Sequence, residues 1–291
     1  MSSAAVKAFE DLSPSERSAI LTLLEDEGAE VHRLLVDRLV GYGPSVLDWL
    51  VPLLPGASPV MRQRIQGVQE VLGREQRSAE FLRYCARPEG EMELEDGVWR
   101  FVLTEYPLVN LDGYQALVDS FAEVLRDRLS PDQDGESLMA VFNRYVFDEL
   151  GFVGNEADYH DPENSFLNRV IDRRTGIPIT LSVLVLLIGK RLGLPLSGVG
   201  MPGHFLSRFR TARHEFYVDA FNRGKLLTKQ DCIRFLNQTK FGFRSEYLEP
   251  VTPRSILLRM CQNLLQHGRH GLSSVSLERY ESFAKALARK R

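Results

Sequence analysis

The sequence predicts an α+β fold in which a central buried helix packs on a small antiparallel sheet, with all-helical segments on both sides. Three observations predict it. Apolar residues recur at three- and four-residue spacing from Ser13 to about Arg87 and again from Pro253 onward, as in amphipathic helices. Residues 179–192 are apolar on nearly every side, as expected of a helix enclosed by its domain. Short runs between residues 197 and 228 have the composition of strands.

The N-terminal segment consists of several short amphipathic helices. Ser13 and Ser15 offer caps for the first helix, and Gly- and Pro-bearing breaks separate those that follow. The order of acidic, apolar and charged residues before a GxP turn resembles a HEAT-like helix pair, whereas a small helical bundle accounts for the same pattern. We predict a helical domain over residues 1–95 that provides contacts rather than chemistry. Polar residues at 88–97 fit a linker.

The core domain is predicted over residues 96–250. Helices at 112–129 and 137–150 precede the central helix, and Pro178 is suited to the first turn of that helix. After the turn at 193–195, strands are predicted at 197–201, 204–209, 214–221 and 225–228, followed by a helix at 229–237. Residues 251–291 are predicted to form a C-terminal extension of two antiparallel helices that pack against the core.

Composition limits the class of protein. The 36 basic and 39 acidic residues give a net charge of −3, so nothing favours a nucleic-acid partner or an anionic membrane surface. The opening residues lack the pattern of a secretory signal, and the apolar run 177–188 is too short to span a bilayer, so we expect a cytoplasmic protein. Cys85, Cys232 and Cys261 lie far apart, which argues against disulfides and structural zinc. No cofactor or metal is expected.

His204 and Asp219 on neighbouring strands form the candidate site. If residues 210–213 form a four-residue loop, His204 lies directly opposite Asp219, with Cβ atoms about 4.5 to 5.5 Å apart. The carboxylate would then fix the imidazole tautomer and stabilise its protonated form, as in a nucleophile–base–acid triad. For such a pair taken alone, a histidine held for structural reasons is the simpler interpretation.

Three segments carry a resemblance to a known family: NSFLNRVIDRRTGIPITLSVLVLLIGKRLGLPLSGVGMPGHFLSRF, EFYVDAFNRGKLLT and EPVTPRSILLRM. Over roughly residues 137 to 262, the chain resembles the SirB-one family of transglutaminase-like proteins. The resemblance implies a transglutaminase-like core with HEAT-like N-terminal and TPR-like C-terminal helices. In catalytic domains of this kind, a cysteine begins a central helix that ends in a Gly–Pro turn, and strands bearing His and Asp follow. Residues 193–195, His204 and Asp219 match the last three stations.

The chain departs from that pattern at the position of the nucleophile. Counting back along the helix places it near Pro178, where there is no cysteine. Cys85 lies too early in the chain, and Cys232 and Cys261 follow both partners. Loss of the nucleophile from a triad costs on the order of 10⁶ in turnover. The resemblance therefore implies a site that keeps the triad's His and Asp without its thiol.

Two hydroxyl residues in the central helix are weaker candidates for a nucleophile. Thr180 and Ser182 lie near its N-terminus, where backbone N–H groups could stabilise an oxyanion. As polar residues in a buried helix, they are more simply explained by hydrogen bonds to a preceding carbonyl.

The segment before the central helix offers candidate binding residues. Asn164 and Asn168 flank a short predicted helix, and Arg174 follows it on the approach to the site. We predict Asn164 as a cap first and a pocket donor second. His160 with its acidic neighbours would suggest a metal site, but DYHDPEN fits a capped, solvated loop better.

Two functions remain open from the sequence. The first is a non-catalytic transglutaminase-like protein that binds a protein or peptide partner in a regulatory role. The alternative is a hydrolase or protease-like enzyme that acts on amide bonds, with His204 as general base and water, Thr180 or Ser182 as nucleophile. The alternative requires His204 to be partly exposed in a concave pocket. Direct contact with DNA is a distant third, without support from charge or motif.

Overall fold

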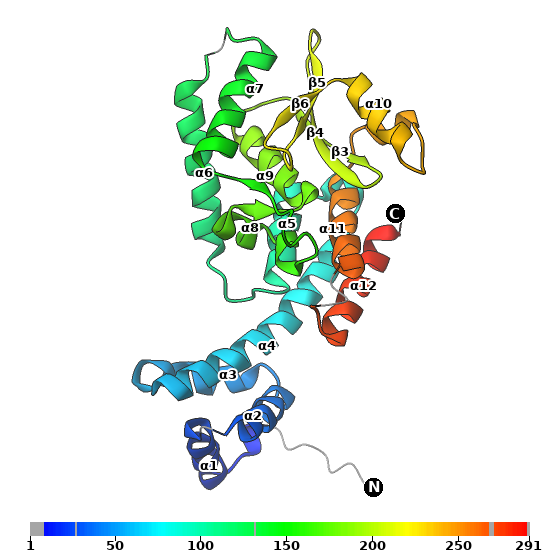
Figure 1. Ribbon diagram of the computed structural model, residues 1–291. Helices are drawn as coiled ribbons and strands as arrows, with labels where there is room; N and C mark the ends of the chain where they lie inside the picture. Colours follow the sequence, from blue (N-terminus) through cyan, green and yellow to red (C-terminus); the bar gives the residue numbers. More distant parts are fainter. Residues whose placement is uncertain (1–8, 27, 131, 268–270, 290–291) are drawn as a thin grey trace. The chain divides into compact units, whose positions relative to one another are not determined.

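The computed structural model describes residues 9–26, 28–130, 132–267 and 271–289. By its internal contacts the chain divides into two compact units, one formed by residues 1–79 and 103–109 and the other by 80–102 and 110–291. The described part of the first unit is helical (Figure 1), and its elements are η1 Phe9–Asp11, α1 Pro14–Glu25, α2 Ala29–Gly41, α3 Ser45–Leu50, η2 Val51–Gly56 and the first part of α4 Pro59–Cys85.

The first unit has a hydrophobic core of its own. Leu24, Leu39 and Ile65 are completely buried in a cluster drawn from residues 9–72. The predicted cap at Ser13 is confirmed: its hydroxyl accepts the N–H of Glu16, and the Glu16 carboxylate accepts the N–H of Ser13 at 2.7 Å. This reciprocal arrangement is a capping box, which fixes where α1 begins.

The second unit combines helices with two small sheets (Figure 1). Its helices after α4 are η3 Glu89–Glu91, α5 Leu94–Leu103, α6 Leu111–Arg128, α7 Gly135–Asn143, the π-helix η4 Arg144–Glu149, η5 Pro162–Ser165, α8 Leu167–Arg173, α9 Pro178–Arg191, α10 Lys229–Gln238, η6 Ser245–Leu248, α11 Pro253–His267 and α12 Ser274–Ala288. Its strands are β1 Val153–Gly154, β2 Thr175–Gly176, β3 Leu196–Met201, β4 His204–Arg210, β5 Glu215–Asp219 and β6 Lys225–Leu227.

The buried helix α9 lies at the centre of the second unit. Every residue from Pro178 to Gly189 is buried, and Pro178 occupies the first turn, as predicted. β3, β4 and α6 contact it, while α10 contacts β5 and β6 (Figure 1). The four-stranded sheet is antiparallel in the order β3-β4-β5-β6. The predicted α+β core with a central helix is therefore confirmed.

The predicted hairpin register is wrong by two residues. The structure pairs Ser207 with Val218 and Arg210 with Glu215, so the loop is 211–214 rather than 210–213. In the structure the Thr211 hydroxyl accepts the N–H groups of Arg213 and His214 and so stabilises a loop at 211–214. The strand pairing therefore ends one residue later on β4, and begins one residue later on β5, than predicted. A two-residue shift keeps every side chain on its face of the sheet.

The predicted linker at 88–97 is also wrong, because α5 begins at Leu94. Val98, Trp99 and other apolar residues of this helix are buried in the second unit. Gly97 is a packing contact and not a break, since a Cβ there would lie 2.5 Å from a methyl group of Leu257 and 3.0 Å from the ring of Tyr84. The sequence alone does not distinguish a glycine that permits close packing from a glycine that ends a helix.

The tail belongs to the second unit. Residues 251–291 fall in the same unit as 110–250. α11 and α12 pack against each other, and buried Arg254 of α11 donates to the carbonyl oxygens of Cys85 and Leu287 at 3.1 and 3.3 Å. In the described ranges, no helix combines the length and the apolar character needed to cross a membrane.

Candidate functional site

A cleft of two compartments surrounds His204 at the start of β4. The larger compartment has a volume of about 760 Å³ and the smaller about 340 Å³. Tyr159, Pro178, Gly203 and His204 line both. The larger compartment continues over β5, β6 and α10, and the smaller continues along α11. His204 thus stands at the junction of two spaces that differ in their chemistry.

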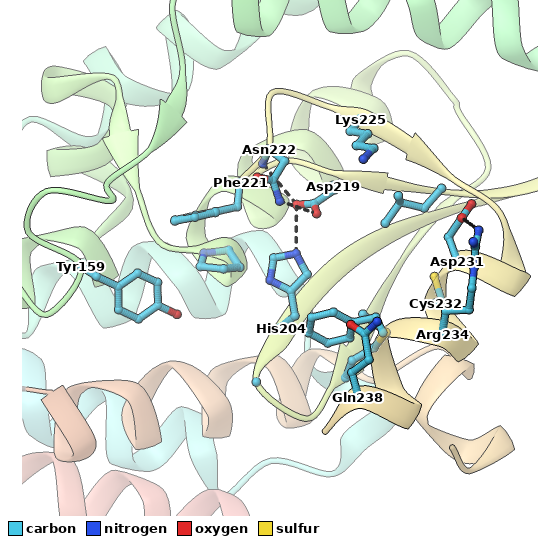
Figure 2. A pocket seen from close by; sticks show the side chains of 15 residues that line it. Tyr159, His204, Asp219, Phe221, Asn222, Lys225, Asp231, Cys232, Arg234 and Gln238 are labelled. Carbon is cyan, nitrogen blue, oxygen red and sulfur yellow. Dashed lines mark hydrogen bonds and ion pairs between the residues drawn. The ribbon is translucent and has the colours of Figure 1, made fainter. Parts of the chain in front are cut away.

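His204 and Asp219 meet at the base of the larger compartment (Figure 2). The two atoms His204 Nε2 and Asp219 Oδ1 are 2.9 Å apart, with 12% of the histidine and 6% of the aspartate side chain exposed. The distance is that of a charge-assisted contact, although the ring N–H is not aligned on the oxygen as in an ideal hydrogen bond. Because the register differs from the predicted one, the residues meet diagonally across β4 and β5.

Asn222 donates two hydrogen bonds to the carboxylate of Asp219. Its backbone N–H donates to Oδ1 at 3.2 Å and its side-chain amide donates to Oδ2 at 2.8 Å. Burial alone would raise the pKa of Asp219, but the contact with His204 and the hydrogen bonds from Asn222 outweigh it and hold that pKa below its ordinary value. Asp219 is therefore a carboxylate at neutral pH, and its charge lies against the His204 ring.

The cleft contains no activated thiol. Pro178 lines both compartments at the N-terminus of α9, the position that the resemblance assigns to the nucleophile, and it has no nucleophilic atom. Cys232 also lines the larger compartment, but burial raises the pKa of its thiol to about 12. Figure 2 shows Cys232 beside Asp231 and Arg234, away from the His204–Asp219 pair. A thiol in that setting stays protonated and inert.

The two hydroxyl candidates lie outside the cleft. Thr180 and Ser182 are completely buried in α9, and neither lines a compartment. Ser182 bonds the carbonyl of Phe205 on β4 at 3.4 Å rather than a preceding carbonyl of its own helix, and the Thr180 hydroxyl has no partner among the described residues. Because both side chains are enclosed, the structure offers no support for a nucleophilic role, and that role stays a prediction.

The three predicted binding residues do not line the cleft either. Asn164 is buried and holds the preceding loop, accepting from Asn155 at 3.0 Å and donating to the carbonyl of Asp158 at 2.7 Å. It caps no helix, because the cap of η5 is Asp161, so that prediction is wrong. Asn168 is buried in α8. A direct binding role for Asn164 and Asn168 stays a prediction.

Arg174 ends α8 in the left-handed region, at φ 59°. Its guanidinium lies 4.6 Å from the ring centroid of Phe152 and 5.3 Å from that of Phe121. Burial between these rings lowers the pKa of Arg174. The arrangement is a cation–π sandwich inside the unit, so any contact of Arg174 with a ligand also stays a prediction.

The acidic loop before α8 is held by arginines. Arg173 pairs with Asp161 at 2.6 Å and with Glu163 at 2.9 Å, and Asp161 also accepts the N–H of Glu163. Within the described ranges, no three His, Cys, Asp or Glu side chains are grouped so that they could hold a metal ion. The loop agrees with the capped, solvated interpretation of DYHDPEN.

Several residues of the cleft are not among the predicted site residues. Phe221 and Phe235 flank the imidazole, with ring centroids 6.4 and 5.9 Å from it, and Tyr159 and Arg259 line the smaller compartment. Arg259 donates to the carbonyl of His204 at 2.9 Å. No local signal identifies these residues, because they come from a loop, a turn and two helices that only the fold brings together.

Comparisons with known proteins agree with this architecture. Residues 112–262, more than half of the chain, match the family described as the transglutaminase-like superfamily. A UPF0162 protein of Xylella fastidiosa (strain Temecula1) is 38% identical over 167 residues, which cover 55% of this chain and 59% of the relative. Human F-box only protein 21 is 32% identical over 189 residues, covering 55% of this chain and 30% of that protein.

The match is therefore one of a shared core, since the chain spans less than two thirds of the length of these relatives. No solved structure matches the chain significantly. The matched span contains α9, the sheet, His204, Asp219 and most of α11. On the matched family and the agreement of its span with the observed core, the chain belongs to the transglutaminase-like superfamily.

Proposed function

We propose that this protein is a non-catalytic member of its superfamily that binds a protein or peptide segment in the cleft around His204. One observation carries the proposal: Pro178 stands at the N-terminus of α9 in the same cleft as the His204–Asp219 pair, where a triad needs its nucleophile. An imidazole and a carboxylate can orient and bind an amide, but with Pro178 at that position the site lacks the thiol on which a triad of this kind forms its acyl intermediate.

The lining of the cleft supports a peptide as the occupant. Tyr159, Phe221 and Phe235 provide aromatic surface, while His204 and Asn222 provide polar groups between them. Apolar walls with a few placed polar groups are typical of ligand sites. The similarity to F-box only protein 21 is consistent with a part in protein recognition.

The test joins a binding assay to a turnover assay on the intact protein. A peptide array identifies ligands, and the same peptides are then assayed for hydrolysis and acyl transfer. Phe235→Ala removes an aromatic wall of the cleft, and Phe241→Ala is its matched control, since the two rings are 39% and 51% exposed and only Phe235 lines the cleft. We expect Phe235→Ala to weaken peptide binding, Phe241→Ala to leave it unchanged, and no turnover in any variant.

A hydrolase that uses water is the second candidate. It is favoured by the exposed fraction of His204, which lines both compartments instead of being enclosed by apolar side chains. Turnover that His204→Ala abolishes, while circular dichroism shows an intact fold, would establish the hydrolase and reject the non-catalytic proposal. Peptide binding that Phe235→Ala leaves untouched would move the binding site away from the cleft.

The finer assignments are part of the same proposal. We propose membership of the SirB-one family, HEAT-like helices in residues 1–95, a core in 96–250, and TPR-like helices in 251–291. Residence in the cytoplasm belongs to the same proposal.

A further inference from the structure

The smaller compartment is lined by one face of α11. Arg259, Gln262, Asn263 and Gln266 all contribute to it, and their spacing of three and four residues places them on one side of the helix. The opposite side, with Leu257, Met260, Cys261 and Leu264, is buried in the unit. α11 therefore presents a guanidinium and three carboxamides to a cavity that also contains His204.

Arg259 has no carboxylate partner within the part of the chain that the structure describes. One of its N–H groups donates to the carbonyl of His204 at 2.9 Å, and its guanidinium lies 5.7 Å from the ring centroid of Phe205. No carboxylate among the described residues pairs with it, and no Asp or Glu lines the smaller compartment. Burial lowers the pKa of Arg259, with a smaller opposing effect from Tyr159, so its positive charge is held at a cost in solvation that no carboxylate of the described residues offsets.

Other arginines of the same unit show the contrast. Arg191 pairs with both Glu95 and Asp119, and Arg173 pairs with Asp161 and Glu163. Arg259 also has N–H donors left over after its bond to the His204 carbonyl. Those donors face a cavity, whereas the donors of Arg191 and Arg173 face carboxylates. A guanidinium with spare donors in a cavity is suited to a carboxylate ligand.

The neighbouring amides indicate which carboxylate fits. Gln262, Asn263 and Gln266 each offer a donor and an acceptor, the pair that a peptide bond requires. At about 340 Å³ the smaller compartment holds roughly a residue or two, and it joins the larger compartment at His204. These features suit the end of a peptide chain, where a carboxylate and a peptide bond lie next to each other.

We propose that the smaller compartment binds the C-terminal carboxylate of a peptide, with Arg259 as its cationic partner and the carboxamides of α11 as partners of the last peptide bond. The inference rests on the proposed peptide-binding function and adds the orientation of the peptide: its C-terminus lies against α11, and the preceding residues pass His204 into the larger compartment.

The experiment compares free and amidated C-termini on the intact protein. The probes are N-acetylated randomised hexapeptides, each prepared as the free acid, as the C-terminal amide, and as an amide with an internal Glu. Affinities are measured for the unchanged protein, Arg259→Gln and Arg259→Lys. Arg234→Gln is the matched control, because Arg234 lines only the larger compartment and already pairs with Asp231.

We expect the free acids to bind about tenfold or more tightly than the amides, as for a charged hydrogen-bonded pair. Arg259→Gln should abolish that preference, Arg259→Lys should keep part of it, and Arg234→Gln should retain it. A merely structural role of Arg259, through its bond to His204, would instead weaken acid and amide equally. Equal affinity of acids and amides, or tight binding of amides with an internal Glu, would overturn the proposal.

A small probe separates this inference from the proposed function. N-acetylglycine and N-acetylglycinamide contain the terminal group without a peptide chain, and ligand-observed NMR detects weak binding of either. If no hexapeptide binds, the proposed function fails, but saturable binding of N-acetylglycine that Arg259→Gln removes would still support the carboxylate site. The same response to N-acetylglycine and its amide would reject it.

Discussion

At the scale of single residues, the cleft is organised around the carboxylate of Asp219. His204 and two donors of Asn222 surround it, although only a small fraction of the aspartate is exposed. Such a carboxylate is stabilised in its charged form, and the charge in turn orients the imidazole. The site thus keeps the paired His and Asp that orient a catalytic base, although Pro178 supplies no nucleophile.

Replacing Pro178 by cysteine tests whether that setting is still competent. In Pro178→Cys the new thiol should have a pKa below the ordinary value of about 8.5 and should react with iodoacetamide at pH 7 about tenfold or more faster than in Pro178→Cys/His204→Ala. Background labelling should be slow, because burial raises the pKa of Cys85 and Cys232 to about 12 and that of Cys261 well above its ordinary value. Equal rates in the two variants would show that His204 does not face Pro178.

Asp219→Asn should lower stability in a way that depends on pH. The folded pKa of Asp219 lies below that of the unfolded chain, so its contribution is complete above about pH 4 and is lost as the pH falls through the folded pKa. At pH 7 we expect a loss of about 1–3 kcal/mol by urea unfolding, narrowing toward zero in acid. Asp127→Asn, at an exposed position of α6, should show neither the loss nor its pH dependence.

Single residues also show what the sequence can and cannot predict. The meeting of His204 and Asp219 follows from the alternation of strands, and it survives a register error because a two-residue shift preserves the face. Arg259 could not be found in this way. In the sequence it is one of two arginines on an amphipathic helix, and its cavity exists only when α11, β4 and α9 are brought together.

At the scale of elements, the turn between β5 and β6 holds the site in place. The backbone N–H of Gly224 donates to the carbonyl of Asp219 at 2.8 Å, and its φ of 72° lies in the left-handed region. Asn143 and Phe147 pack directly against this glycine, so that a Cβ would lie 2.5 Å from atoms of both side chains. The turn fixes Asn222 and thereby the geometry of the Asp219 carboxylate.

Gly224→Ala should therefore be costly in both stability and function. Backbone strain and overpacking together predict a loss of about 2–4 kcal/mol, with weaker peptide binding as the turn shifts. Gly151→Ala is the matched control: its φ of 77° is similar, but no atom lies within 4 Å of its added Cβ. It should cost only about 1–2 kcal/mol of strain. Equal losses in chemical denaturation would mean that packing at Gly224 contributes nothing.

Elements differ in how well the sequence predicts them. α9 is predicted to within one residue at each end, because its uniform apolar character and Pro178 both mark it. α5 is missed, since its acidic first turn and Gly97 resemble a linker when the packing of Leu257 against that glycine is unknown. The π-helix η4 has no signal in its residue types and is indistinguishable from the end of α7.

At the scale of the whole molecule, the chain consists of two compact units. Residues 103–109 return to the first unit after 80–102 have entered the second, and α4 contributes residues to both. Such a division depends on contacts between distant segments, so composition and breaks cannot reveal it. Among the described residues, the buried cluster of the first unit is nevertheless drawn from residues 9–72.

Because the first unit has a core of its own, we expect that it can be destabilised without affecting the cleft. Leu39→Ala removes a completely buried side chain of α2 and should lower the stability of that unit by about 2–5 kcal/mol. Leu34→Ala, on the same helix but 57% exposed, should change it by less than about 0.5 kcal/mol. Calorimetry should show one of two transitions shifted by Leu39→Ala, with peptide affinity unchanged. A matching drop in affinity would reveal that the two units act together.

The burial of α9 from Pro178 to Gly189 also matters for synthesis. A ribosome delivers residues 178–191 before β3 and β4, the strands that cover one side of this helix, have been made. A nascent chain at that stage displays an uncovered apolar helix, a surface that chaperones recognise and that promotes aggregation. Fragments that stop between α9 and the end of β4 should therefore accumulate as insoluble protein, so expression of a shortened core has to extend beyond Arg210.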